Sequence, residues 1–142
     1  MRYIAAIASL SLAATFSCGG PVPEEPAAEP AADYCLVYFG TGGGDAKGIY
    51  VSEVDPATDQ VSEAKLAATL AGAGFVEIHP SRSWLFSTAR DREVEEPWHG
   101  VDGYSIDHAN GLLTEFSRAS CVGHGPAHVN ISPAGSAVSV AN

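Results

Sequence analysis

The stretch GIYVSEVDPATDQV (48–61) decides the fold, because a related stretch, GVDGYSIDHANGLL, follows at 100–113. The alignment of the two places Asp55 on Asp107 at an offset of 52 residues. In the first copy, residues alternate between two faces with period two, which is typical of a β-strand. The strand then gives way to a turn that Asp55 can cap. The pair of stretches therefore predicts a structural unit that the chain repeats.

A second pair of segments repeats at almost the same offset. FVEIHPSRSWLFSTA (75–89) aligns with HVNISPAGSAVSVAN (128–142), which places Pro80 on Pro133, 53 residues later. Each period holds about four short strands, which is the size of one β-propeller blade. An antiparallel sandwich would also consist of short strands, but it would not repeat at this offset. We therefore predict an all-β fold, a β-propeller, with about two four-stranded blades in residues 34–142.

Two blades are too few for a closed ring, since propellers typically have about four to eight. In repeat architectures each unit also covers the apolar face of its neighbour. We therefore expect residues 34–142 to be a partial propeller whose missing C-terminal blades are needed to close the ring. Oligomerisation of a two-blade protein into a ring is the alternative.

The composition excludes several classes of function. The chain has 142 residues, a net charge of −10 and 46% hydrophobic residues. It is too apolar for a disordered chain, and its acidity argues against binding nucleic acid or an anionic membrane surface. Only four of the 17 acidic residues lie in the segment 19–33, so the folded part is acidic as well.

The N-terminal residues indicate export. A positive charge precedes an apolar run at 4–16, which is too short to span a bilayer and is typical of a signal sequence. The run ends near Cys18, and a bacterial lipoprotein signal ends at the cysteine that is lipidated. We therefore interpret residues 1–18 as a signal peptide with lipidation at Cys18. Simple cleavage after Ser17 or Gly19 is the competing interpretation.

The segment 19–33, GGPVPEEPAAEPAAD, contains four prolines and four acidic side chains. This composition disfavours helix and strand and predicts an extended, solvated linker. The expected location is the bacterial cell envelope, with the lipid at Cys18 as the only membrane contact, or the periplasm. Export would permit a disulfide between Cys35 and Cys121, but two small buried apolar residues are at least as good an interpretation.

The folded part resembles the N-terminal part of the 6-phosphogluconolactonase-type lactonase family. The matching stretches are YCLVYFGTGGG…GIYVSEVDPATDQV, IHPSRSWLFSTA, GVDGYSIDHANGLLTEF and GHGPAHVNISPAGSAVSVAN. The last follows a family pattern of Gly-x-x-Pro-x-His, an apolar pair, Ser-Pro-x-Gly and a closing Val-Ala-Asn. The resemblance covers residues 34–142 and implies a seven-bladed β-propeller that hydrolyses a lactone. The family also includes muconate-lactonizing relatives, so the resemblance does not fix the substrate.

The chain departs from the family at two places. Relatives usually have an Asn-Glu pair where this chain has Ala89 and Arg90, and often an aromatic residue where it has Gly42. If the family's Glu binds or activates substrate, that group is missing here, and Asp91 or Glu93 could replace it.

Lactone hydrolysis needs an activated water, stabilisation of the oxyanion and a proton for the leaving alkoxide. Histidine is the natural acid/base near neutral pH, and arginine is a natural partner for an oxyanion. His128 stands at the family's Pro-x-His position and begins a strand that we expect to line the central channel. It is our candidate acid/base, and a histidine that bonds backbone groups across the seam between blades is the alternative. Arg90 and, more weakly, His124 are candidates for substrate binding.

Neither a metal site nor a cofactor is predicted. His124 and His128 are close in sequence, but Gly125 and Pro126 between them forbid a helix that would bring both rings to one side. No third ligand is evident for such a site. His99, in EEPWHG, is expected at a loop surface.

Two loops invite a functional interpretation that we do not favour. RDREVEEPWHG (90–100) is the most polar segment of the folded part and could overhang the channel, but an ordinary solvated loop packed over Trp98 is favoured. GTGGGDAKG (40–48) lacks the Lys-Ser/Thr pair and the helix of a phosphate loop, so we interpret it as a flexible connection.

Two functions follow from these observations. The first is an exported lactonase that opens a sugar-derived or related lactone. Because a phosphorylated sugar lactone is a cytosolic metabolite, export indicates a different lactone. The alternative is a non-catalytic, lipid-anchored propeller that binds a protein or a saccharide.

Overall fold

The structure is a computed structural model and describes residues 34–91 and 97–142. The predicted signal peptide (1–18) with Cys18 and the linker (19–33) lie outside the described residues, as does Glu93. All regular elements in the described part are β-strands, and none of its segments is a helix able to cross a membrane.

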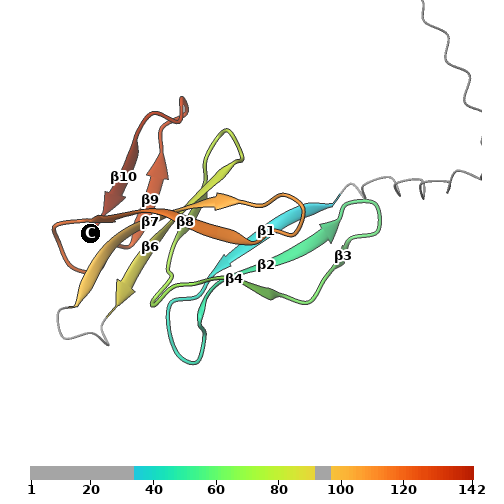
Figure 1. Cartoon of the computed structure of the whole chain (residues 1–142), viewed down its shortest axis with the longest axis horizontal. Helices are drawn as coiled ribbons and strands as arrows, with labels where there is room; N and C mark the ends of the chain where they lie inside the picture. The colour runs from blue at the N-terminus through green and yellow to red at the C-terminus, as the bar shows by residue number, and fades with distance from the viewer. Residues whose placement is uncertain (1–33, 92–96) are drawn as a thin grey trace, which may run out of the picture. The chain divides into compact units, whose positions relative to one another are not determined.

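Ten strands make up the described part (Figure 1). In chain order they are β1 (Cys35–Gly40), β2 (Gly48–Asp55), β3 (Gln60–Val61), β4 (Lys65–Thr69), β5 (Val76–Ile78), β6 (Trp84–Asp91), β7 (Trp98–Ile106), β8 (Leu113–Ser120), β9 (His128–Ile131) and β10 (Val138–Ala141).

These strands form three antiparallel sheets. The first sheet has the order β1-β2-β3, with β4 also paired to β2. The second sheet has the order β5-β6-β7-β8, so consecutive strands are neighbours throughout. The third sheet consists of β9 and β10. The prediction of an all-β fold with four strands per repeat is confirmed, and the described residues contain a further, two-stranded sheet.

The first repeat in the sequence is also a repeat in hydrogen bonding. Asp55 accepts the N–H of Ala57 at 2.8 Å, and Asp107 accepts the N–H of Ala109 at 2.9 Å. The two turns therefore have the same side-chain cap, 52 residues apart. This confirms that Asp55 caps its turn.

The second repeat relates the turn before β6 to the turn before β10. The N–H of His79 donates to the carbonyl of Trp84 at 2.9 Å, and the N–H of Ser132 donates to that of Ala137 at 2.9 Å. Arg82 and Gly135 occupy equivalent positions in these turns and both have left-handed φ angles, of 62° and 71°. The backbone thus repeats even where the side chains differ.

The core lies between the first and second sheets. It consists of alternate, inward-facing residues of both sheets and of the segment that joins them: Ile49, Leu70, Ala73, Leu85, Ala89 and Tyr104. Each is at most 6% exposed, so the two sheets exclude water from their shared face. Burial of this apolar area is the main stabilising contribution to the pairing of the two sheets.

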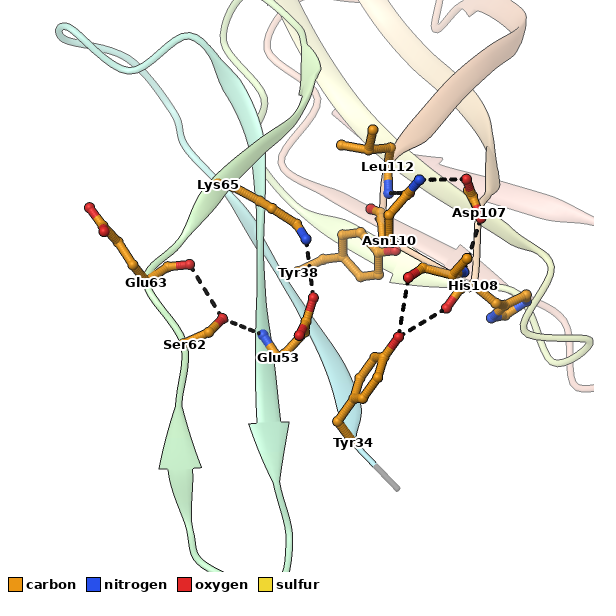
Figure 2. A network of polar contacts seen from close by, with 12 residues as sticks. Tyr34, Tyr38, Glu53, Ser62, Glu63, Lys65, Asp107, His108, Asn110 and Leu112 are labelled. Carbon is orange, nitrogen blue, oxygen red and sulfur yellow. Dashed lines mark hydrogen bonds and ion pairs between the residues drawn. The ribbon is translucent and has the colours of Figure 1, made fainter. Parts of the chain in front are cut away.

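Two tyrosines, one in β1 and one directly before it, also bind the turn that follows β7. The hydroxyl of Tyr38 donates to the carbonyl of Gly111 at 3.0 Å, and that of Tyr34 reaches the carbonyl of Ala109 at 3.3 Å. Figure 2 shows the Tyr34 ring extending toward this turn, whose shape is fixed by Asp107. The turn therefore contributes to the contact between the sheets.

The opposite face of the second sheet is only partly covered. β9 lies against β5 and β6, but Trp84 and Phe116 on this face are 43% and 53% exposed. A groove of about 230 Å³ runs between this face and β10, with Phe86 and Val138 among its walls. The two strands of the third sheet thus cover a part of the apolar surface that the second sheet presents.

Candidate functional site

The strand pairing brings the candidate residues to one edge of the sheets. Arg90 lies opposite His99 near the ends of β6 and β7 that face the β6–β7 connection. At the same edge, β9 begins with His128, opposite Ala141. Because β5, β6 and β7 are antiparallel neighbours, β5 and β7 begin at this edge, and the contact between the Phe75 and His128 rings places the start of β9 there as well. Residues far apart in sequence therefore share one rim.

His128 begins β9, as predicted, and its side chain is exposed. Its ring centroid lies 4.1 Å from that of Phe75, with 39° between the ring planes. Within the described residues the imidazole makes no hydrogen bond. The hydrogen bond across the seam between the second and third sheets is made by another histidine, His79, whose Nε2 lies 3.0 Å from the Gly135 carbonyl oxygen.

Arg90 lies near the end of β6, where it is half-buried. Its N–H donates to the carbonyl of Ala71 at 3.2 Å. Its Nη2 atom would lie 3.9 Å from a methyl group at Gly74, the residue that precedes Phe75. The guanidinium therefore lies beside the segment whose next residue stacks on His128.

A pocket of about 540 Å³ opens next to Arg90. Its walls include Gly42, Lys47 and Gly72, so the Gly-rich connection interpreted as a flexible link forms a wall of a pocket. Gly72 has a φ of 60°, and a Cβ there would clash with the backbone carbonyl of Arg90. Two cations, Lys47 and Arg90, and two carboxylates, Asp45 and Asp91, line this pocket, so its lining is formally neutral. Lys47 and Arg90 are the groups in it that can bind an anionic oxygen.

His124 pairs with His99 rather than with His128. The His99 and His124 ring centroids are 5.2 Å apart and nearly perpendicular, at 86°. The N–H of Gly125 donates to Nδ1 of His99 at 3.4 Å. Both rings line a second pocket, of about 480 Å³, together with Pro97. His99, expected at a loop surface, is instead half-buried in β7.

The two pockets are lined by residues at equivalent positions of successive repeats. An offset of 52 residues places Lys47 on His99, and an offset of 53 places Gly72 on Gly125, whose φ angles are 60° and 74°. The repeat offset could therefore have indicated His99 as a site residue, but sequence reasoning did not use it in this way. Within residues 34–91 and 97–142, no three His, Cys, Asp or Glu side chains gather as metal ligands.

A buried carboxylate lies behind this rim, and sequence reasoning missed it. Asp102, on β7, is fully buried, and its nearest charged partner is Arg118, whose Nε is 3.7 Å from Oδ1. The Arg118 guanidinium also lies 3.9 Å above the Trp98 ring. Burial raises the pKa of Asp102 to about 6, and Arg118 offsets only part of that effect. The sequence signal available for Asp102 was the alternation along β7, which places Asp102 and Tyr104 on the same inward face.

Comparison with known proteins identifies the family. The model of the family described as "Lactonase, 7-bladed beta-propeller" matches residues 36–142. The chain belongs to this lactonase family. It is 33% identical over 99 residues to the 6-phosphogluconolactonase of Bacillus subtilis (strain 168), a match that covers 70% of this chain and 27% of that protein.

Two solved structures have the same fold. One is a protein of Bacteroides fragilis NCTC 9343 provisionally named 6-phosphogluconolactonase, with a TM-score of 0.65 and 16% identity. The match covers 79% of this chain and 30% of that one. A similarly named protein of Bacteroides uniformis ATCC 8492 has a TM-score of 0.60, 18% identity, and coverage of 69% and 28%. The chain thus spans less than a third of the length of these lactonase-family relatives.

The departure from the lactonase family has a structural counterpart. Ala89, at the position where an Asn is usual in the family, is 1% exposed and packs in the core between the sheets. Arg90, at the position of the usual Glu, faces the pocket beside Lys47. Where the resemblance implied an Asn-Glu pair, this chain therefore has a buried alanine followed by a cation at the rim.

Proposed function

We propose that the protein hydrolyses a lactone, with His128 as the general acid/base and Arg90 as a substrate-binding residue. The observation that carries this proposal is the exposed His128 imidazole at the same rim as Arg90, in a chain of the lactonase family. An imidazole without a hydrogen-bond partner in the described residues is free to accept a proton from water.

The chemistry requires one water and no cofactor. The water oxygen bonds to the lactone carbonyl carbon as His128 accepts its proton, and a guanidinium such as that of Arg90 stabilises the oxyanion. The ring C–O bond then breaks, and His128 returns the proton to the leaving alkoxide. The product is a hydroxy acid, which ionises and releases one proton to solvent.

Further groups of the site are proposed to come from additional blades. The relatives are more than three times as long as the matching part, and the family's ring has seven blades. The exposed Trp84 and Phe116 support this proposal, because a further pair of strands beside β10 would cover them. C-terminal blades that close the ring would surround His128 with side chains from several blades.

The substrate is proposed to be a sugar-derived lactone that is available outside the cytoplasm. The signal sequence predicted at 1–18 and the candidate lipidation at Cys18 support export to the cell envelope. Arg90 and, more weakly, His124 would bind oxygen atoms of the substrate, since both line pockets at the rim.

The test is an assay of the intact protein against a panel of sugar-derived and simple lactones, with proton release as the signal. We expect turnover of at least one lactone and a loss of about 10²–10⁴-fold in His128→Ala. His108→Ala is the matched control, because His108 is an exposed histidine in the Asp107 turn, and we expect it to retain the wild-type rate.

Two results would contradict the proposal. One is no turnover above the uncatalysed rate with any lactone, and the other is an unchanged rate in His128→Ala. Absence of turnover together with binding of a saccharide or a protein would favour the alternative function, a non-catalytic, lipid-anchored propeller. The replacement of the family's usual Asn-Glu pair by Ala89 and Arg90 is the observation that favours this alternative.

A further inference from the structure

Phe75 and His128 occupy equivalent positions in successive repeats. They are 53 residues apart, the same offset that relates Pro80 to Pro133. Phe75 directly precedes β5, the first strand of the second sheet, and His128 begins β9, the first strand of the third. β5 and β9 lie against each other, so the repeat itself places the two rings side by side.

The contact between these rings is not part of the core. Phe75 is 41% exposed and His128 is exposed, whereas the core residues between the first two sheets are at most 6% exposed. The ring centroids are nevertheless only 4.1 Å apart, and the planes are tilted by 39°. The pair therefore lies at the rim, outside the core between the first two sheets, and its contact is a local one between two rings.

The backbone of Phe75 is held rigidly. Its N–H donates to Oγ1 of Thr88 at 2.8 Å, and its carbonyl accepts the N–H of Thr88 at 2.9 Å. Thr88 is fully buried in the middle of β6. The preceding residue, Gly74, adds a third bond, from its N–H to the Thr88 carbonyl at 3.0 Å. Phe75 is therefore a fixed ring on the second sheet against which a side chain of the third sheet can rest.

We propose that Phe75 is a positioning residue that holds the His128 imidazole in one orientation at the rim. Within the described residues the Phe75 ring is the one aromatic partner of this imidazole, which makes no hydrogen bond or ion pair there, so its loss should widen the range of side-chain torsions that His128 adopts. The catalytic consequence rests on the proposed function, because an acid/base must be held in hydrogen-bond reach of the reacting atoms. The orientation itself does not depend on that function.

The first test is spectroscopic and uses the intact protein. An aromatic ring at 4.1 Å shifts the imidazole C–H proton resonances of its neighbour, so we expect the His128 signals to move toward free-histidine values in Phe75→Leu. Phe75→Tyr restores a ring and should restore the shift. Phe116→Leu is the control, because Phe116 is an exposed phenylalanine that contacts Trp84 and Phe86 instead.

The second test is kinetic. We expect Phe75→Leu to lower kcat about tenfold with KM within twofold of wild type, and Phe75→Tyr to recover most of kcat. Phe116→Leu should leave both constants unchanged. A loss confined to kcat indicates that the catalytic group is misplaced, whereas lost ground-state binding would raise KM.

The outcomes separate this proposal from the proposed function. If His128 signals are the same in wild type and Phe75→Leu, the positioning proposal is wrong whatever the activity. If KM rises and kcat is kept, Phe75 is a substrate platform and the proposal is likewise overturned. If the intact protein turns over no lactone, the proposed function fails, and the spectroscopic shift still tests the contact between Phe75 and His128 on which the positioning proposal depends.

Discussion

The Nε2 atom of His79 lies 3.0 Å from the carbonyl oxygen of Gly135, which joins the turn before β6 to the equivalent turn before β10. His79 is 9% exposed, and its Nδ1 lies 2.8 Å from the Ser81 hydroxyl. Both ring nitrogens are therefore satisfied within the protein. This histidine stabilises the seam between the second and third sheets and leaves His128 free at the rim.

This relationship predicts that Gly135 cannot be replaced independently of His79. Gly135→Ala should destabilise the protein by more than the roughly 1–2 kcal/mol of a left-handed alanine, because its Cβ would clash with the His79 ring. In a His79→Ala background the extra cost should disappear. Urea unfolding of the single and double variants measures both values.

Gly44→Ala is the control that measures the cost of a left-handed alanine without a clash. Gly44 has the same φ of 71° as Gly135, but a Cβ there would meet nothing within 4 Å. Gly44→Ala should therefore lower the free energy of unfolding only by the cost of placing an alanine in the left-handed conformation. An equal cost of Gly135→Ala with and without His79 would show that the two residues are not in contact.

Asp102 predicts a specific dependence of stability on pH. Its pKa is about 6 in the folded protein and 3.8 in its ordinary state, because burial disfavours the charged form. The folded state therefore holds this proton more tightly than the unfolded state. The contribution of this proton to the free energy of unfolding is fully present below about pH 4. It is lost as the pH rises through 6, and the loss is up to about 3 kcal/mol.

Asp102→Asn should remove this dependence. Its free energy of unfolding at pH 7 should exceed that of wild type by about 1–3 kcal/mol, and the two should converge near pH 4. Asp59→Asn, at an exposed turn position with a φ of 56°, is the matched control and should follow wild type at both pH values. Parallel curves for wild type and Asp102→Asn between pH 4 and 7 would contradict the prediction.

The pocket beside Arg90 predicts a charge-specific effect on substrate binding. Lys47→Met should raise KM about tenfold for a lactone that carries an anionic group and leave KM for a neutral lactone unchanged, since one cation of the pocket is lost. Lys65→Met is the control, because Lys65 pairs with Glu53 at 3.1 Å and does not line this pocket. Equal effects of the two variants, measured as KM for both lactones, would argue against an anion at Lys47.

The fold could be predicted from the sequence to the extent that turns demand particular residues. Asp55 and Asp107 must both present a carboxylate to the backbone two residues later, so the chain retains them at a fixed offset. The division of the strands into three sheets was harder to predict from the sequence. β9 and β10 form a sheet of their own because β9 packs against β5 without hydrogen-bonding to it, and local patterns do not encode that distinction.

Individual residues of the candidate site could be predicted from the sequence, but the contacts between them could not. His128 is at the start of a strand, as expected, whereas Arg90 was expected in the loop 90–100 and lies near the end of β6 instead. Their neighbours Phe75 and His99 were missed, because contacts between adjacent sheets depend on how the sheets pack. The offset of 53 that relates Phe75 to His128 was the one signal that could have found this contact.

The role of His128 as acid/base is tested by the steady-state rate of proton release by the intact protein. Wild type and His128→Gln are compared with the lactone that the wild type turns over fastest. Glutamine keeps a polar side chain of similar size but cannot exchange a proton near neutral pH. We expect kcat to fall by at least about 100-fold in His128→Gln with an unchanged fold. Equal rates for the two proteins would contradict this role of His128.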